Sequence, residues 1–144
     1  MATIRKEIVL DARLGDAWDA LRDFHAVHER LVPGFVTDSR PDGDNARIVT
    51  FFNGAVAREV LVGVDEAAHR LAYHIPEGLP GCTHHSASAE VIADGQRCRF
   101  VWVTDVLPDE LAGVIEPMME QGAGVLKATL DASAPGVTST SEQP

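Results

Sequence analysis

Hydrophobic positions change period along the chain, and this change separates strands from helices. Residues 3–12 alternate apolar and polar side chains, as is typical of a half-buried strand. Residues 15–24 instead repeat apolar side chains every three or four positions, which predicts an amphipathic helix. A shorter helical piece is expected over 25–31, and Pro33-Gly34 ends it.

Six further strands are predicted between Phe35 and Val106. Residues that favour tight turns separate them, for example Asn53-Gly54 and Asp94-Gly95. Because the connections are short, consecutive strands should be antiparallel neighbours. The predicted strands cover residues 35–39, 47–52, 56–64, 70–75, 83–93 and 97–106.

A long helix is expected from residue 109 to 131. Pro117 should kink this helix or split a short leading helix from it. Residues 132–144 are mostly small and polar and include Pro and Gly, which predicts a disordered tail after a domain that covers 1–131. The apolar side of the helix comprises Leu111, Ile115, Met118, Met119, Gly122, Val125, Leu126 and Leu130.

The order of these elements predicts an α+β fold. A seven-stranded curved antiparallel sheet would grip the long C-terminal helix, with two short helices after the first strand. One helix cannot fill the whole concave face of such a sheet. We therefore expect a cavity between them.

Composition excludes several partners. The chain has 144 residues and a formal net charge of −10, so phosphate backbones and anionic headgroups are disfavoured as partners. No stretch approaches the roughly 20 apolar residues of a membrane span, and the N-terminal residues are too charged for a signal peptide. We expect a cytoplasmic protein that contacts neither nucleic acid nor the membrane interior.

No sequence motif indicates a cofactor or a metal. The glycine-rich motifs for nucleotides and the GxSxG motif of hydrolases are absent. His25 and His28 have a spacing that could begin a zinc site, but further ligands are missing. Cys82 and Cys98 should lie too far apart along one hairpin to form a disulfide.

Several segments resemble the SRPBCC superfamily (START-like, helix-grip), and within it the polyketide cyclase/dehydrase-like bacterial branch. The similarity covers residues 3–131, although Leu31 stands where many relatives have Trp. It implies the helix-grip fold and a hydrophobic cavity. The segments that carry it are Ala17-Trp18-Asp19-Ala20-Leu21, Arg22-Asp23-Phe24, Val32-Pro33, Arg58-Glu59-Val60-Leu61, Leu71-Ala72-Tyr73-His74-Ile75, Phe100-Val101-Trp102, Leu107-Pro108, Gly122 and Leu126-Lys127.

Glu59 is a candidate acid or base. The alternation of residues 56–64 favours the valines inward and Glu59 outward, whereas the resemblance implies that Glu59 faces the cavity. A carboxyl group among apolar walls would have a raised pKa. A solvent-facing Glu59 on the convex surface is the alternative.

His85 is the second catalytic candidate, because its side chain titrates near neutral pH. Alternation places His85 and Ala87 on one face of their strand, where small side chains leave space under the helix. Tyr73 and Ile75 share a face of the neighbouring strand, and the resemblance implies that Tyr73 lines the pocket. For both His85 and Tyr73, ordinary core packing is the alternative.

The hairpin at Asp94-Gly95 decides which face of the last strand is buried. A two-residue turn aligns His85 with Thr104 and turns Phe100 and Trp102 inward. A three-residue loop instead turns the opposite face inward, and the resemblance favours this second arrangement. The residues it would bring to the cavity are Val101, Val103 and Asp105.

The leading hypothesis is that the protein binds a hydrophobic small molecule (a polyketide-like, lipid or aromatic metabolite) in its cavity. A cofactor-free cyclase, dehydratase or isomerase is the first alternative, with Glu59 or His85 moving protons while Tyr73 or Arg99 polarises a carbonyl. A ligand-free partner-binding module is the second, and a homodimer is left open. The predicted ligand-binding residues are Tyr73, Ile75, Ala87, Val101, Val103, Asp105, Met118, Met119 and Gly122.

Overall fold

A computed structural model describes residues 1–134, and it confirms the predicted α+β architecture. Each predicted strand is present, with ends that differ by a few residues from the prediction. The elements are β1 (Ala2–Leu10), α1 (Leu14–Arg22), the 3₁₀ helix η1 (Phe24–Ala26), α2 (Val27–Arg30), β2 (Val36–Pro41), β3 (Ala46–Phe51), β4 (Val56–Asp65), β5 (Arg70–Glu77), β6 (His84–Asp94), β7 (Arg97–Leu107), the 3₁₀ helix η2 (Asp109–Leu111) and α3 (Ala112–Ala132).

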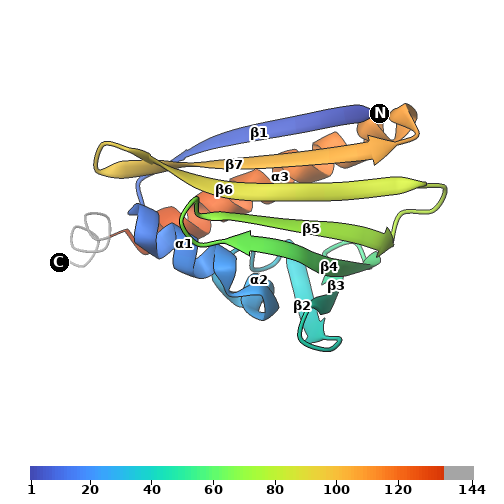
Figure 1. Ribbon diagram of the computed structural model, residues 1–144, viewed down its shortest axis with the longest axis horizontal. Helices are drawn as coiled ribbons and strands as arrows, with labels where there is room; N and C mark the ends of the chain where they lie inside the picture. The colour runs from blue at the N-terminus through green and yellow to red at the C-terminus, as the bar shows by residue number, and fades with distance from the viewer. Residues whose placement is uncertain (135–144) are drawn as a thin grey trace.

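The seven strands form one antiparallel sheet. Its order is β1-β7-β6-β5-β4-β3-β2, so strands β2 to β7 follow the chain and β1 closes the far edge against β7 (Figure 1). The short turns predicted from the sequence produce this meander, because each returns the chain directly beside the preceding strand.

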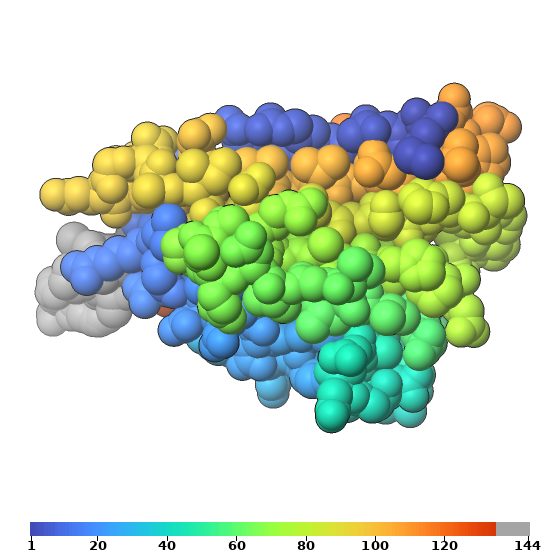
Figure 2. Space-filling view, in the orientation of Figure 1, coloured from blue at the N-terminus to red at the C-terminus, as the bar shows by residue number. Residues whose placement is uncertain are grey.

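Helix α3 covers one face of the sheet and forms the second layer. In the view of Figure 1 it runs behind β6 and β7, and in Figure 2 the strands hide nearly all of it. Its buried side chains include Ile115, Met119, Leu126 and Leu130, which recur at helical spacing along the side that meets the sheet. Helices α1 and α2 close one end of the space between the layers.

The C-terminal helical region, η2 and α3, differs from the prediction at Pro117. The break between helix types falls at Leu111 and Ala112, where η2 passes into α3, and α3 continues through Pro117. The predicted split at Pro117 is therefore wrong. The predicted tail lies mostly outside the described residues.

The β6–β7 hairpin has a two-residue loop, Gly95-Gln96, between the paired residues Asp94 and Arg97. Gly95 takes a left-handed conformation with φ +66°, which suits its missing side chain. This loop has the length of the first predicted alternative but begins one residue later.

The later start of the loop moves every pairing partner along β7 by two residues. His85 therefore pairs with Val106 rather than with Thr104. A shift of two keeps the same face of β7 inward, because side chains alternate with period two. Phe100 and Thr104 are buried on that inner face, as the two-residue alternative required.

Candidate functional site

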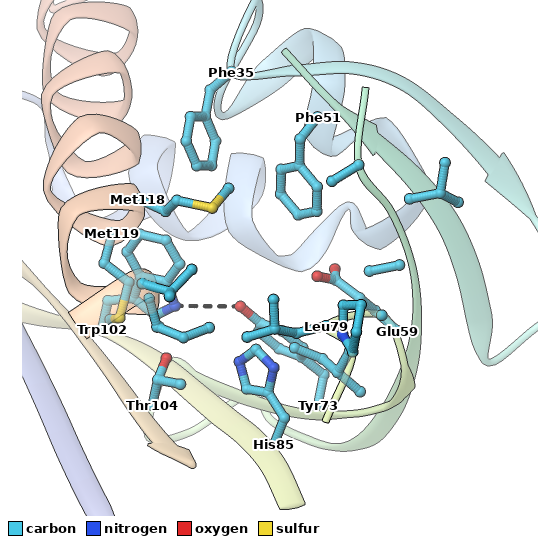
Figure 3. A pocket seen from close by; sticks show the side chains of 18 residues that line it. Phe35, Phe51, Glu59, Tyr73, Leu79, His85, Trp102, Thr104, Met118 and Met119 are labelled. Atoms are coloured by element: carbon cyan, nitrogen blue, oxygen red, sulfur yellow. Dashed lines mark hydrogen bonds between the residues drawn. The ribbon is translucent and has the colours of Figure 1, made fainter. Parts of the chain in front are cut away.

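A cavity of about 400 Å³ lies between the inner face of the sheet and the first half of α3 (Figure 3). Nearly all of its wall is apolar. Val56 and Val114 are exposed at its rim, with 54% and 49% of their surface accessible. The lining residues are Phe35, Phe51, Ala55, Val56, Ala57, Glu59, Tyr73, Ile75, Gly78, Leu79, Pro80, His85, Trp102, Thr104, Val114, Ile115, Met118 and Met119.

Glu59 lies in this wall, and its side chain is only 9% exposed. Its Oε1 accepts a hydrogen bond from Arg47 Nε at 2.8 Å and forms an ion pair with Nη2 at 2.7 Å. In Figure 3 the carboxylate points into the cavity. Glu59 therefore faces inward, as the resemblance implied and the alternation of β4 did not.

Arg47 holds Glu59 in place and was missed in the sequence. Its Nη1 donates to the carbonyl of Phe24 at 2.7 Å, and its guanidinium lies 3.9 Å from the centre of the Phe24 ring. Arg47 pairs with Glu59 across β3 and β4, at equal distances in sequence from Asn53. Opposite charges placed symmetrically around the Asn53-Gly54 turn were the signal that could have revealed this pair.

Tyr73 faces the cavity from β5. Its hydroxyl oxygen accepts a hydrogen bond from Trp102 Nε1 at 3.2 Å, drawn as a dashed line in Figure 3. Burial raises the pKa of Tyr73, and the Glu59 carboxylate raises it further. The phenol therefore stays protonated, and its O–H remains a donor.

His85 faces the cavity from the first part of β6. Its Nδ1 is buried and has no hydrogen-bond partner among residues 1–134. Burial lowers the pKa of His85 to about 4, and His84 and His74 lower it in the same direction. The imidazole is therefore neutral at physiological pH.

The structure brings six of the predicted site residues together in the cavity wall. They are Glu59, Tyr73, Ile75, His85, Met118 and Met119.

Two of the predicted residues are packed instead of lining the cavity. Ala87 is buried in the core, between Tyr73 and Thr104 on the neighbouring strands. Gly122 packs against the ring of Phe35, which would lie 3.0 Å from an added Cβ atom. Gly122 needs its missing side chain for this close approach, and Ala87 is buried, two situations that the sequence pattern did not distinguish from open space.

The predicted inner face of β7 is wrong. Val101, Val103 and Asp105 do not line the cavity, because the two-residue loop turns Trp102 and Thr104 inward instead. Asp105 accepts a hydrogen bond from Thr3 Oγ1 on β1. Arg99, on the same face of β7 as these three, forms ion pairs with Glu7 and Asp94.

The cavity also contains Phe35 and Phe51, which were not singled out from the sequence, and Trp102, which only the two-residue alternative turned inward. Phe35 and Phe51 meet edge to face, with ring centres 5.6 Å apart, and Trp102 lies opposite the α3 methionines. Apolar alternation in β3 and β7 could have indicated Phe51 and Trp102, but only with the correct register, whereas Phe35 lies directly before β2.

Within residues 1–134, no group of three or more His, Cys, Asp or Glu side chains is arranged to hold a metal ion. Cys82 and Cys98 are free thiols whose Sγ atoms contact the carbonyls of His84 and Ala12. None of the described helices combines the length and apolar character needed to cross a membrane.

A curved sheet, a long covering helix and an apolar cavity between them define a helix-grip protein of the START-like type. The sequence matches the family model for polyketide cyclase / dehydrase and lipid transport over residues 1–134. The chain belongs to this family, and the resemblance to the SRPBCC superfamily is confirmed. A comparison with curated proteins found no match.

Solved structures share the fold. A protein from Thermobifida fusca is 29% identical with a TM-score of 0.71, and the alignment covers 92% of this chain and 91% of that one. The di-domain ARO/CYC protein BexL of the BE-7585A biosynthetic pathway is 15% identical with a TM-score of 0.77, over 94% of this chain and 48% of BexL. A START superfamily protein from Mycobacterium smegmatis is 14% identical with a TM-score of 0.61, over 88% and 97% of the two chains.

Proposed function

We propose that this protein binds an apolar small molecule, of polyketide-like, lipid or aromatic character, in the large cavity. The observation that carries this proposal is the hollow of about 400 Å³ with almost entirely apolar walls. Ligand sites typically combine such walls with a few polar groups that orient the ligand. Family membership supports the same function.

Three polar side chains would orient the ligand. The Glu59 carboxylate accepts hydrogen bonds, and the Tyr73 hydroxyl donates one. The neutral imidazole of His85 carries the unpartnered Nδ1. A ligand with one or more hydroxyl or carbonyl groups on an apolar frame would satisfy these groups better than a pure hydrocarbon.

A cofactor-free cyclase, dehydratase or isomerase is the second candidate. It is supported by the family and by the presence of Tyr73 and His85 in one cavity, where a phenol could polarise a carbonyl while an imidazole takes a proton. A pKa of about 4 makes His85 a weak base at neutral pH. Glu59 is already engaged by Arg47. Both facts favour binding over catalysis.

Two cavity variants test the proposal. Ile75→Trp places an indole in the cavity, whereas His74→Trp places the same group on the outer face of β5. With the neutral dye N-phenyl-1-naphthylamine, we expect saturable binding to the wild type. Ile75→Trp should weaken it about tenfold or more, the scale of overpacking costs of ~1–3 kcal/mol, and His74→Trp should not.

Native mass spectrometry of the purified protein gives an independent readout. A co-purified metabolite, lost in Ile75→Trp and retained in His74→Trp, is the expected result. Conversion of that metabolite during incubation would favour the enzyme instead. Absence of saturable dye binding together with an empty mass spectrum would refute both functions.

A further inference from the structure

A second, smaller hollow of about 70 Å³ lies beyond the large cavity. It is enclosed by α1, α2 and the segment after α2, by the inner face of the sheet from β2 to β7 and by the second half of α3. Leu31, Ala89 and Leu126 line this hollow and do not line the large cavity. At roughly 30 Å³ for each water-sized group, it has room for about two or three carbon atoms.

The two hollows share five lining residues, which form a partition between them. These are Phe35, Phe51, Glu59, Tyr73 and Trp102. The polar groups of the partition therefore border a hollow on each side, and both hollows have mainly apolar walls, although Arg47 also lines the smaller one. Figure 3 shows the Glu59 carboxylate pointing into the space between Phe51 and Tyr73.

Most hydrogen-bonding capacity at the partition is already used. Arg47 donates to Glu59 Oε1 and to the Phe24 carbonyl, and Trp102 donates to the Tyr73 oxygen. Among residues 1–134 no hydrogen bond ends on Glu59 Oε2, and no group accepts the Tyr73 O–H. One acceptor and one donor thus remain at this position.

We propose that the ligand carries a hydroxyl group within its frame, with a large apolar body on one side of it and an apolar tail of about three carbons on the other. This inference rests on the proposed function and specifies its ligand. The hydroxyl lies at the partition, donates to Glu59 Oε2 and accepts from Tyr73. The body fills the large cavity, and the tail passes between the shared side chains into the smaller hollow. A ligand with a terminal hydroxyl would leave that hollow's apolar walls without contacts.

A homologous series of 1-(naphthalen-2-yl)alkan-1-ols, with tails from methyl to hexyl, tests this shape. The naphthalene is the body, and its fluorescence reports binding. We expect affinity to rise about fourfold for each methylene up to propyl, because each buried methylene stabilises the complex. Beyond propyl, affinity should fall because the small hollow is full.

Variants of the small hollow should move the preferred tail length. Ala89→Leu fills the hollow and should shift the optimum to methyl, whereas Leu31→Ala enlarges it and should shift the optimum beyond propyl. Ala57→Leu is the matched control, because Ala57 lines only the large cavity. It should weaken the whole series without moving the optimum. Thermal melting identifies any variant that fails to fold. If one of Ala89→Leu and Leu31→Ala does not fold, the shift in preferred tail length measured with the other variant tests the inference.

The outcomes separate this inference from the proposed function. If the series and N-phenyl-1-naphthylamine all fail to bind, both are overturned. The series could bind with an affinity that does not depend on tail length, or Ala89→Leu and Leu31→Ala could leave the optimum at propyl. Either result would overturn the two-sided ligand and leave binding in the large cavity intact.

Discussion

Glu59 and His85 both face the large cavity, yet only Glu59 has a partner of opposite charge. Arg47 lies 2.7 Å from the Glu59 carboxylate, on the adjacent strand. The ionisable groups that act on His85 are the imidazoles of His84 and His74. Two titratable side chains in one cavity thus meet opposite electrostatic surroundings.

The difference shows two ways in which a protein can accommodate a buried titratable side chain. Removing a charged group from water is costly, so it must either gain a partner or lose its charge. The carboxylate gains charge-assisted hydrogen bonds from Arg47, whereas the imidazole remains neutral. The cavity consequently presents one ionic acceptor at Glu59 and an uncharged polar group at His85.

The largest expected effect comes from separating the paired charges. Arg47→Met would leave a buried carboxylate without a partner and should lower the free energy of unfolding by about 3–5 kcal/mol. Urea denaturation at neutral pH measures this loss. The double variant Arg47→Met with Glu59→Leu should recover much of it, because no unpaired charge then remains.

An exposed ion pair provides the control. Arg58 contacts Asp42 at 2.8 Å, but both side chains are more than a third exposed. Arg58→Met should cost less than about 1 kcal/mol, since solvent screens such pairs. Equal losses in Arg47→Met and Arg58→Met would contradict the distinction between buried and exposed charge.

A smaller effect should appear at His85 as the pH is lowered. Its pKa is about 4 in the folded protein, against an ordinary value of 6.5, so the unfolded chain binds the proton more readily. The contribution of His85 to the free energy of unfolding should therefore be fully present above pH 6.5. It should be lost as the pH falls from 6.5 through about 4, by up to ~3 kcal/mol. His84 and His74 act in the same direction, and Glu59 and Tyr73 line the same cavity.

Denaturation of the wild type and His85→Gln at a series of pH values measures this contribution. Both proteins share the other titrating groups, so the difference between their curves isolates His85. We expect His85→Gln to lose less stability than the wild type between pH 6.5 and 4. Parallel curves would show that His85 is freely solvated.

The smallest effect is expected at Asp105, on the face of β7 that does not line the cavity. Asp105→Asn retains an oxygen that can accept from Thr3, so stability should change by less than about 0.5 kcal/mol. Binding of N-phenyl-1-naphthylamine should be unchanged. A marked loss of dye affinity would indicate that this face contributes to the ligand site.

The fold could be predicted because its signals are local. Alternation of period two located the strands, and the turn residues fixed their sequential pairing. Alternation could not show which face of β4 points into the cavity, because Val62 and Val64 remain exposed on the outer side of the sheet. Apolar side chains are common on protein surfaces, so alternation alone chose the wrong face for Glu59.

The site depended on register, which the sequence specifies weakly. A change in the β6–β7 loop decides whether Trp102 or Val103 faces the cavity. The contact of Arg47 with Glu59 likewise required the pairing of β3 with β4. Ala87 and Gly122 show a further limit, because a small side chain can indicate either free volume or close contact.

The pairing of β1 with β7 also has a consequence during biosynthesis. β1 leaves the ribosome before β2 to β7, and its partners Cys98 to Val106 are translated some hundred residues later. At about 5–20 residues per second, β1 waits on the order of 5–20 s for them. Its apolar side chains, Ile4 and Ile8, stay uncovered for that time. Lys6 meets Glu116 and Glu120 later still, so β1 gains these contacts only after the first half of α3 has been translated.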